Sequence, residues 1–244
     1  MPEAARPQRV LVVGLGGLGC PVATVLGRAA GVELWLCDDD VVDLSNLHRQ
    51  TLYGDADVGH DKLSAAQAAL VAAGCAAERI RLVRSRLLPD NARQLVSQVD
   101  LVVEGADNFA TKFLAADAAK LEGKPVVHGA AVRLVGTAWA VAASGAPCYR
   151  CLFEDVPPGA QQGCNEAGVL GPVVGFCGAL MADLALRVLS GDATAFGSLY
   201  TFSAHPDRLR QVEAPRRPDC PLCGSTPSIS DIQEARYTNP SCAA

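Results

Sequence analysis

The 244-residue sequence predicts an α/β fold with one mixed sheet, parallel in its first half and antiparallel in its second half. Three observations support this prediction. Short apolar runs alternate with helical segments over residues 10–127, which is typical of a parallel sheet with helices on both faces. After residue 132, strand-like segments replace this alternation. Two Cys-x-x-Cys pairs indicate a four-cysteine metal knot that closes the second half.

The first half should alternate strands and helices in the order βαβαβαβαβ. Its strands are short apolar runs, expected at residues 10–13, 32–37, 79–84, 101–103 and 125–127. Its helices are the longer segments between these runs, expected at residues 22–30, 61–73, 89–99 and 109–122. Parallel strands in this order place their carboxyl ends along one edge of the sheet.

The second half should complete the sheet with antiparallel strands. We expect a strand at residues 132–142, a loop at 157–168, an apolar helix at 173–189 and a closing hairpin at 199–203 and 209–213. This half shares the core of the first half, so residues 1–224 are predicted to form a single domain. Residues 225–244 are polar and are predicted to form a flexible tail.

Composition narrows the function classes. The net charge of −5 argues against nucleic acid as the main partner. The longest apolar stretch, residues 167–182, contains several glycines and Pro172 and ends at Asp183, so we expect no transmembrane helix and no membrane partner. Residues 1–9 lack the apolar core of a signal peptide, which predicts a cytoplasmic protein. Ten cysteines in such a protein point to metal binding and not to disulfides.

A glycine turn follows the first strand and contains Gly14, Gly16, Gly17 and Gly19. Glycines allow a tight turn and let a phosphate approach the backbone, and the N-terminus of the next helix attracts an anion. Asp38 ends the second strand about twenty residues later, where an acid can bond a ribose hydroxyl. By itself this pattern fits NAD binding, or a glycine-rich turn in an unrelated α/β protein.

The stretch after the second strand favours a triphosphate over a dinucleotide. It contains Asn46 and Arg49, and arginine forks onto phosphate oxygens. Lys62 stands at the start of a helix, where it is either a charge for a phosphate or a solvated first-turn residue. Asp107 follows a central strand, where open α/β sheets bind ligands, and it could also cap the next helix.

Three motifs together carry a family resemblance. Gly-Leu-Gly-Gly-Leu-Gly, Asp-Leu-Ser-Asn-Leu-His-Arg-Gln and Cys-Tyr-Arg-Cys resemble those of the ThiF/MoeB/HesA adenylyltransferases, relatives of the ubiquitin-activating enzymes, over nearly the whole chain. The resemblance implies a Rossmann-like fold that uses ATP and Mg²⁺. It implies that Asp38 holds the ribose and that Asp107 binds Mg²⁺. The residues in contact with the triphosphate would be Asn46, Arg49 and Lys62, so that Arg49, Lys62 and Asp107 serve catalysis.

Two cysteine pairs form the predicted metal site, which consists of Cys148, Cys151, Cys220 and Cys223. A Cys-x-x-Cys turn aims two thiolates at one tetrahedral ion, so two such pairs make a closed, structural Zn²⁺ site. Such a site contributes folding energy and leaves no position open for catalysis. A redox pair is the alternative, but neither motif has a thioredoxin-like context. The family resemblance supports zinc.

Cys164 lies in a glycine-bearing loop before a helix start, a position that favours a thiolate. From the residues alone, an exposed and unreactive cysteine is the better interpretation. The resemblance reverses that preference, because a cysteine at the matching position in ThiF is implicated in a covalent link to the activated carrier. In MoeB-like members it is not needed for adenylation. We therefore count Cys164 among the candidate catalytic residues.

The resemblance implies ATP-dependent adenylation of a small ubiquitin-like sulfur carrier with a Gly-Gly C-terminus. A sulfurtransferase or desulfurase would then supply sulfur for a thiocarboxylate, in thiamine or molybdopterin synthesis, and family members form homodimers. Two departures leave alternatives open. Lys112 stands where relatives carry arginine, and only residues 1–9 precede the first strand, where relatives have a helix whose arginine reaches the partner subunit's ATP site. The alternatives are a non-catalytic carrier-binding module and, with less support, an NAD-dependent oxidoreductase.

Overall fold

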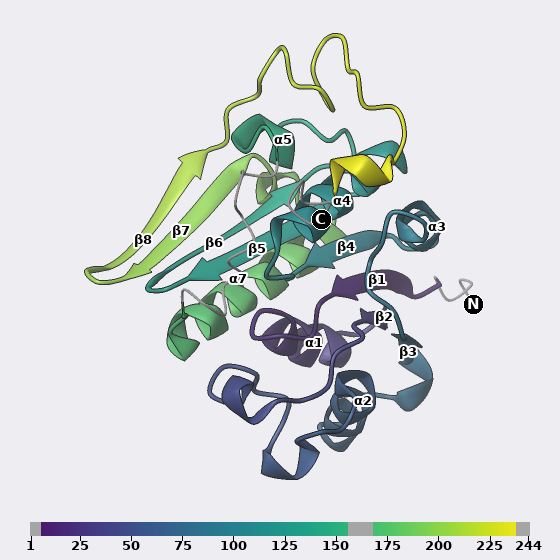
Figure 1. Cartoon of the computed structure of the whole chain (residues 1–244), viewed down its shortest axis with the longest axis vertical. Coiled ribbons are helices and arrows are strands. Elements are labelled where there is room, and N and C mark those ends of the chain that lie inside the picture. The colour runs from purple at the N-terminus through teal and green to yellow at the C-terminus, as the bar shows by residue number, and fades with distance from the viewer. Residues whose placement is uncertain (1–5, 156–167, 238–244) are drawn as a thin grey trace, which may run out of the picture.

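The computed structural model, which describes residues 6–155 and 168–237, contains a mixed β-sheet with helices on both faces (Figure 1). Its strands lie in the order β3-β2-β1-β4-β5-β6-β7-β8. The strands are β1 (Gln8–Val13), β2 (Val32–Cys37), β3 (Ile80–Val83), β4 (Leu101–Glu104), β5 (Val126–Val132), β6 (Val135–Val141), β7 (Ser198–Ala204) and β8 (Asp207–Glu213). The helices are α1 (Gly19–Arg28), α2 (Lys62–Ala72), α3 (Ala92–Ser97), α4 (Phe109–Leu121), α5 (Tyr149–Leu152) and α7 (Gly171–Leu189).

The sheet joins a parallel half to an antiparallel half, as the sequence predicts. Strands β3, β2, β1, β4 and β5 pair in parallel, and β5, β6, β7 and β8 pair in antiparallel register. From β1 the chain moves to β2 and β3 on one side, and then to β4 and β5 on the other. This reversal makes a switch point between β1 and β4, and open α/β sheets bind ligands at the carboxyl ends of the strands at such a point.

Alternating side chains of each parallel strand enter two cores, one on each face of the sheet. On β1, Val10 and Val12 lie in the core with α1, α2 and α7, whereas Leu11 and Val13 lie in the core with α3 and α4. The two-residue period of a strand produces this alternation. Burial on both faces explains why the strands of this half are continuous apolar runs in the sequence.

The turn between β5 and β6 differs from the sequence prediction. We expected a strand to end at residue 127 and another to cover residues 132–142. Instead, β5 continues to Val132, and the chain turns at Arg133 and Leu134 so that Val132 pairs with Val135. Arg133 takes the positive φ of 54° that this turn requires, and neither glycine nor proline marks it in the sequence. An unbroken apolar pattern therefore concealed the hairpin.

By length and composition alone, one helix among the described residues could cross a membrane, and that helix is α7. Its packing gives another reason for its composition. Val173, Cys177, Met181 and Leu184 are at most 1% exposed and belong to the core that α7 shares with α1 and the sheet. Burial against the sheet therefore accounts for the apolar character of α7.

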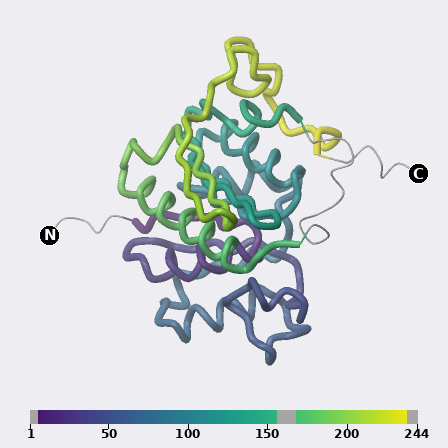
Figure 2. Tube along the Cα trace, turned by 90° about the vertical axis from the view of Figure 1, so that its left-hand side faces the viewer, coloured from purple at the N-terminus to yellow at the C-terminus, as the bar shows by residue number. Residues whose placement is uncertain are grey.

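The segment after the second cysteine pair packs against the rest of the molecule. In Figures 1 and 2 this yellow segment arches over the end of the molecule that holds α5. Ile229 and Tyr237 are buried, and the Tyr237 hydroxyl donates to the Asp117 carboxylate of α4 at 2.7 Å. Arg150 of α5 forks onto the same carboxylate at 2.8 and 2.9 Å. The described part of this segment is therefore packed and is not the flexible tail that we expected. Residues 238–244 lie outside the described residues.

Candidate active site

A cavity of about 200 Å³ lies at the carboxyl ends of the parallel strands. Its walls follow the sheet order, because each strand end contributes residues: Arg86 and Leu87 after β3, Cys37 to Asp40 at β2, Gly14, Gly16 and Gly17 after β1, Gly105 to Asn108 after β4, and Ala130 and Ala131 from β5. The residues predicted for the nucleotide site all line this cavity except Gly19, which lies directly behind the turn. The sequence motifs therefore converge on one space.

Two glycines determine the shape of the turn. Gly14 has φ +85°, a conformation that residues with a Cβ rarely adopt. Gly19 begins α1 and lies so close to Gly14 that an added Cβ would overlap the Gly14 carbonyl oxygen. No side chain caps the N-terminus of α1. The first turn of this helix therefore keeps N–H groups and a partial positive charge to offer to an anion.

Asp38 ties the end of β2 to the glycine turn. Its buried carboxylate accepts the Leu15 N–H at 2.6 Å through one oxygen and the Asp40 N–H at 2.8 Å through the other. Hydrogen bonds to an ionised acceptor are strong, so these contacts fix the turn against the second strand. The sequence predicted Asp38 as a ligand contact and did not reveal this second, structural task.

Arg49 faces the cavity from the loop after β2, on the side where α7 begins. Its Nη2 donates to the Asn46 side-chain oxygen at 2.5 Å, which orients the guanidinium. An added Cβ on Gly17 would meet both the Arg49 backbone and the Val174 side chain of α7, so the loop packs closely between the turn and that helix. Gln50 is buried, lines the cavity and has a side-chain oxygen without a hydrogen-bond partner in the described structure. That oxygen is an acceptor available to a ligand.

Lys62 is only 5% exposed, so the alternative of a solvated first-turn lysine is wrong. The residue before it, Asp61, caps α2 through the Ser64 N–H. The ammonium of Lys62 reaches the cavity and donates to the Asp40 carboxylate at 3.0 Å. A buried charge needs a partner, and Asp40 supplies it.

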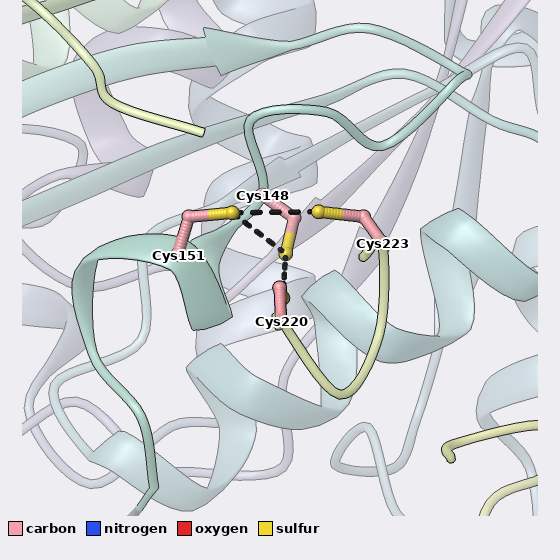
Figure 3. A group of neighbouring side chains, drawn as sticks. All are labelled: Cys148, Cys151, Cys220 and Cys223. Atoms are coloured by element: carbon pink, nitrogen blue, oxygen red, sulfur yellow. Dashed lines mark hydrogen bonds between the residues drawn. The ribbon is translucent and has the colours of Figure 1, made fainter. Parts of the chain in front are cut away.

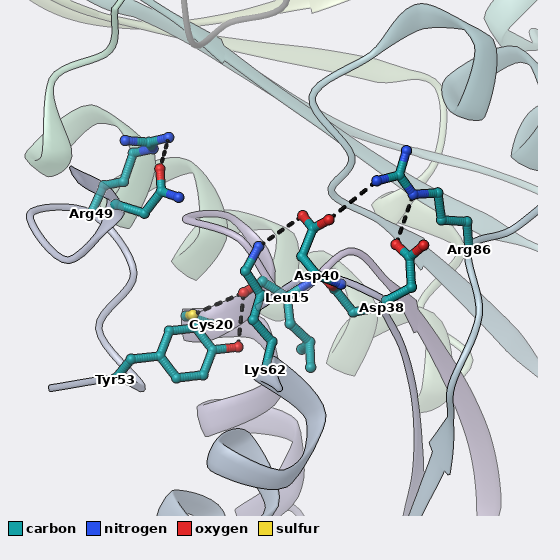
Figure 4. Close-up of polar contacts among 10 residues, drawn as sticks. Leu15, Cys20, Asp38, Asp40, Arg49, Tyr53, Lys62 and Arg86 are labelled. Atoms are coloured by element: carbon teal, nitrogen blue, oxygen red, sulfur yellow. Dashed lines mark hydrogen bonds and ion pairs between the residues drawn. The ribbon is translucent and has the colours of Figure 1, made fainter. Parts of the chain in front are cut away.

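Asp40 also binds Arg86, a residue that no sequence motif singled out. Nη2 of Arg86 lies 3.2 Å from Asp40 (Figure 4). Nε of Arg86 lies 2.7 Å from Asp39. Burial alone would raise the pKa of Asp40, but the hydrogen bonds and charges of Lys62 and Arg86 outweigh burial and hold that pKa below its usual value. Asp40 is therefore an ionised bridge between two cations on the cavity wall.

Asp107 is exposed and lines the cavity beside the turn. The cap of α4 is its neighbour Asn108, whose side-chain oxygen accepts the Thr111 N–H at 2.9 Å. The alternative of Asp107 as the helix cap is therefore wrong. A ligand role for Asp107 stays a prediction.

The two Cys-x-x-Cys motifs meet in space, as the sequence predicts (Figure 3). One pair lies at α5 and the other in the loop after β8, and all four side chains are buried. Their sulfur atoms lie within 4.8 Å of one another. Four thiols at this spacing could hold one metal ion.

The remaining cysteines do not form a second site within the described residues. Cys20, Cys37, Cys75 and Cys177 are buried, as expected for small core residues. Burial raises the pKa of Cys20 and Cys37 to about 12 and that of Cys177 to about 11, so these thiols are protonated at neutral pH. Cys164 lies outside the described residues, and its catalytic role stays a prediction.

A model of the ThiF family matches residues 3–222 of this sequence. The chain belongs to the ThiF family.

Several named proteins are similar to this ThiF-family chain. The adenylyltransferase and sulfurtransferase MOCS3 of Sus scrofa is 40% identical over 92% of this chain and 50% of its own length, so the chain spans half of that protein. The sulfur carrier protein adenylyltransferase of Thermus thermophilus is 40% identical over 94% of this chain and 87% of its own length. The SAMP-activating enzyme E1 of Haloferax volcanii is 38% identical over 96% of this chain and 86% of its own length.

Solved structures confirm the Rossmann-like mixed fold. The crystal structure of E. coli MccB superposes with a TM-score of 0.75 at 18% identity, over 90% of this chain and 66% of that chain. The structure of PaaA gives a TM-score of 0.68 at 22% identity, over 85% of this chain and 64% of that chain. At these identities the likeness concerns the fold alone.

A buried charge cluster lies behind the cavity of this ThiF-family chain. Lys112 of α4 places its ammonium 3.1 Å from both carboxylate oxygens of Glu104, at the end of β4, and also donates to the Gly129 carbonyl. His128 of β5 places Nδ1 3.1 Å from the same carboxylate. None of these three residues is more than 5% exposed. Lys112, the departure from the family's arginine, is thus fully bonded and lines the cavity.

The charge state of this cluster follows from its geometry. Burial alone would raise the pKa of Glu104, but the Lys112 charge and the His128 contact together lower it below its usual value. Burial lowers the pKa of His128. Glu104 and Lys112 are therefore a buried ion pair beside a neutral histidine. Neither Glu104 nor the cluster was predicted from the sequence.

Glu104→Gln is expected to destabilise the protein by about 3–5 kcal/mol, because it leaves the Lys112 ammonium buried without its counter-charge. The double variant Glu104→Gln/Lys112→Met should recover much of that loss, since no orphan charge remains. Urea unfolding measures both. The matched control is Glu122→Gln, which breaks the more exposed Arg93–Glu122 pair at 2.6 Å and should cost less than about 1 kcal/mol. Equal losses at the two sites would contradict the argument from burial.

Proposed function

We propose that the protein is an ATP-dependent adenylyltransferase that activates the C-terminal carboxylate of a ubiquitin-like sulfur-carrier protein ending in Gly-Gly. The observation that carries the proposal is the single cavity onto which the glycine turn, Arg49 and Lys62 converge. The sulfur carrier protein adenylyltransferase of Thermus thermophilus aligns over 87% of its length, and the SAMP-activating enzyme E1 of Haloferax volcanii aligns over 86%. Their similarity to this chain supports adenylation of a carrier protein.

ATP would lie along the sheet edge with its ribose at Asp38 and its triphosphate over the glycine turn. Asp38 makes two backbone hydrogen bonds, and a carboxylate has further lone pairs for a ribose hydroxyl. Arg49 and Lys62 would bring two positive charges to the phosphates, and the N-terminus of α1 would add a partial charge. Lys62 has three donor protons, so it can keep Asp40 while it reaches a phosphate oxygen.

Asp107 fits the requirements of a Mg²⁺ ligand. Mg²⁺ prefers oxygen donors and is commonly held by one or two carboxylates together with substrate phosphates. The exposed carboxylate of Asp107 lies on the cavity wall, next to the space proposed for the triphosphate. When bound there, Mg²⁺ would neutralise charge on the phosphates.

In the proposed reaction, an oxygen of the carrier's terminal carboxylate attacks the α-phosphorus of ATP. A new P–O bond forms as the bond to the β-phosphate oxygen breaks, which gives an acyl-adenylate and pyrophosphate. The carboxylate is already ionised at pH 7 and needs no general base. The protein would contribute orientation and charge stabilisation through Arg49 and Lys62.

An approach for the carrier's C-terminus adjoins the nucleotide cavity. A second cavity of about 470 Å³ shares Asn46, Arg49 and Val169 with the first. A Gly-Gly end has no side chains and can extend through a narrow passage. We infer that it enters here and presents its carboxylate beside Arg49.

The later steps belong to the same proposal. Sulfur from a sulfurtransferase or desulfurase would displace AMP from the acyl-adenylate as a C–S bond forms, to give a thiocarboxylate, and Cys164 is proposed as a relay. Both thiamine and molybdopterin synthesis use such a product, and the family resemblance supports either pathway. A homodimer is also proposed, as is one domain at residues 1–224, followed by a C-terminal segment at 225–244 whose described residues pack on it.

We also infer that the four cysteines hold a structural Zn²⁺. A Zn–S bond of about 2.3 Å places the sulfurs of a tetrahedral site about 3.8 Å apart. The Cys148–Cys220, Cys151–Cys223 and Cys148–Cys151 sulfur distances are 3.5, 3.4 and 4.0 Å. The Arg217 N–H points at the Cys151 sulfur at 3.5 Å and would stabilise a thiolate there.

Cys220→Ser is expected to remove most of the bound zinc and to lower the melting temperature, because the site loses one of four ligands and the tie to the C-terminal loop weakens. Metal analysis by mass spectrometry measures the zinc. Cys177→Ser is the matched control, since Cys177 is a buried cysteine of α7 outside the cluster and should leave the zinc content unchanged. A Cys220→Ser protein that still carries one zinc per chain would rule out this site.

Wild-type protein supplied with a Gly-Gly-ended carrier should exchange labelled pyrophosphate into ATP. Arg49→Ala should slow this exchange by about 10³-fold or more, because the phosphates lose a positioned guanidinium, while the melting temperature stays unchanged. Arg28→Ala is the control, since Arg28 is exposed on α1 and does not line the cavity. It should exchange at the wild-type rate.

Three results would contradict the proposal in different ways. Absence of exchange with every Gly-Gly-ended carrier would exclude the enzyme. Carrier binding with no dependence on ATP would favour the non-catalytic carrier-binding module. Binding of NAD in preference to ATP would favour the oxidoreductase.

A further inference from the structure

The cavity has two ends that differ in chemistry. Arg49 lies at one end, packed against the start of α7, which covers β5 and β6. The other end follows β3, the edge strand of the parallel half, and is formed by Leu87 and Arg86. Figure 4 shows Arg49 and Arg86 on opposite sides of the Asp40–Lys62 pair. The two arginines therefore face different parts of the cavity.

The order of groups along the sheet edge indicates where a nucleobase would lie. Phosphates belong over the turn after β1, and the ribose belongs at Asp38, at the end of β2. A nucleobase is attached to the ribose on the side away from the phosphates, so it lies beyond β2, at the β3 end. This step rests on the proposed function. Towards that end Cys37, the last residue of β2, and Leu87, which follows β3, are at most 3% exposed and form an apolar wall suited to a flat ring.

Arg86 is held in a specific orientation at this end. Its Nε donates to Asp39 at 2.7 Å and its Nη2 donates to Asp40 at 3.2 Å. Both contacts lie along one edge of the planar guanidinium, so these two ion pairs leave its flat face available for a further contact. The Arg86 side chain is 64% exposed, and an ion pair at that exposure adds little stability. Its contacts serve to orient the guanidinium more than to stabilise the fold.

We propose that Arg86 is a nucleobase-contacting residue, whose guanidinium, steered by Asp39 and Asp40, stacks on the purine ring of ATP. Guanidinium planes stack well on aromatic faces, which a lysine ammonium cannot do. The purine would lie between this plane and the apolar wall that contains Leu87. Because Asp39 and Asp40 offset the charge of Arg86, it does not compete with Lys62 and Arg49 for the phosphates.

Calorimetric binding of ATP and of inorganic tripolyphosphate tests this assignment, because only ATP carries the base. Arg86→Ala should weaken ATP binding about tenfold and change tripolyphosphate binding less than about twofold. Arg86→Lys should not restore ATP affinity, since it keeps the charge and loses the plane. The matched control is Arg93→Ala, because Arg93 is also an exposed arginine paired with a carboxylate, at 2.6 Å, and lies outside the cavity. It should leave both affinities unchanged.

Results that differ from these expectations would overturn different parts of the proposal. Equal weakening of ATP and tripolyphosphate by Arg86→Ala would make Arg86 a phosphate contact. Unchanged ATP affinity in Arg86→Ala would show that Arg86 is only a surface ion pair. Wild-type ATP affinity in Arg86→Lys would show that the charge of Arg86, and not stacking by its plane, binds the base. Wild-type protein that binds no ATP would overturn the proposed function itself, and the assignment of Arg86 with it.

Discussion

The close approach of Gly19 to the Gly14 carbonyl is the contact on which the rest of the site depends. Since neither residue has a side chain, the end of β1 and the start of α1 can meet there. The N-terminus of α1 is thereby brought to the edge of the cavity. Asp38 then locks the turn by accepting the Leu15 N–H at 2.6 Å. A larger residue at position 19 would separate strand from helix and displace every group that is positioned from them.

A site for a polyanion must keep cations close together before the anion arrives. In this cavity each cation has a fixed partner. Asn46 orients Arg49, Asp40 pairs with Lys62, and Asp39 pairs with Arg86, while Glu104 pairs with Lys112. These partners reduce repulsion among the cations and limit the motion that ligand binding would have to stop. Catalysis by positioned charges depends on this kind of preorganisation.

Short sequence patterns predicted those parts of the fold and of the site that are formed by residues close together in the sequence. The apolar runs located the parallel strands, and the glycine turn, Arg49 and Lys62 were found because each lies in a short motif. Arg86 could not be found in this way, because only the order of strands in the sheet brings it to the cavity. Glu104 was missed because its partners, Lys112 and His128, come from other elements of the fold. Tyr237 was missed for a similar reason, since a single buried aromatic in a polar segment leaves no periodic pattern.

The most direct test of the central claim is a crystal structure of the protein with a non-hydrolysable ATP analogue. The account predicts that the triphosphate lies between the Gly14–Gly19 turn and the side chains of Arg49 and Lys62, with the ribose at Asp38. Phosphates bound elsewhere, with the turn facing only solvent and with Arg49 and Lys62 keeping the contacts to Asn46 and Asp40 that they make without a ligand, would contradict it.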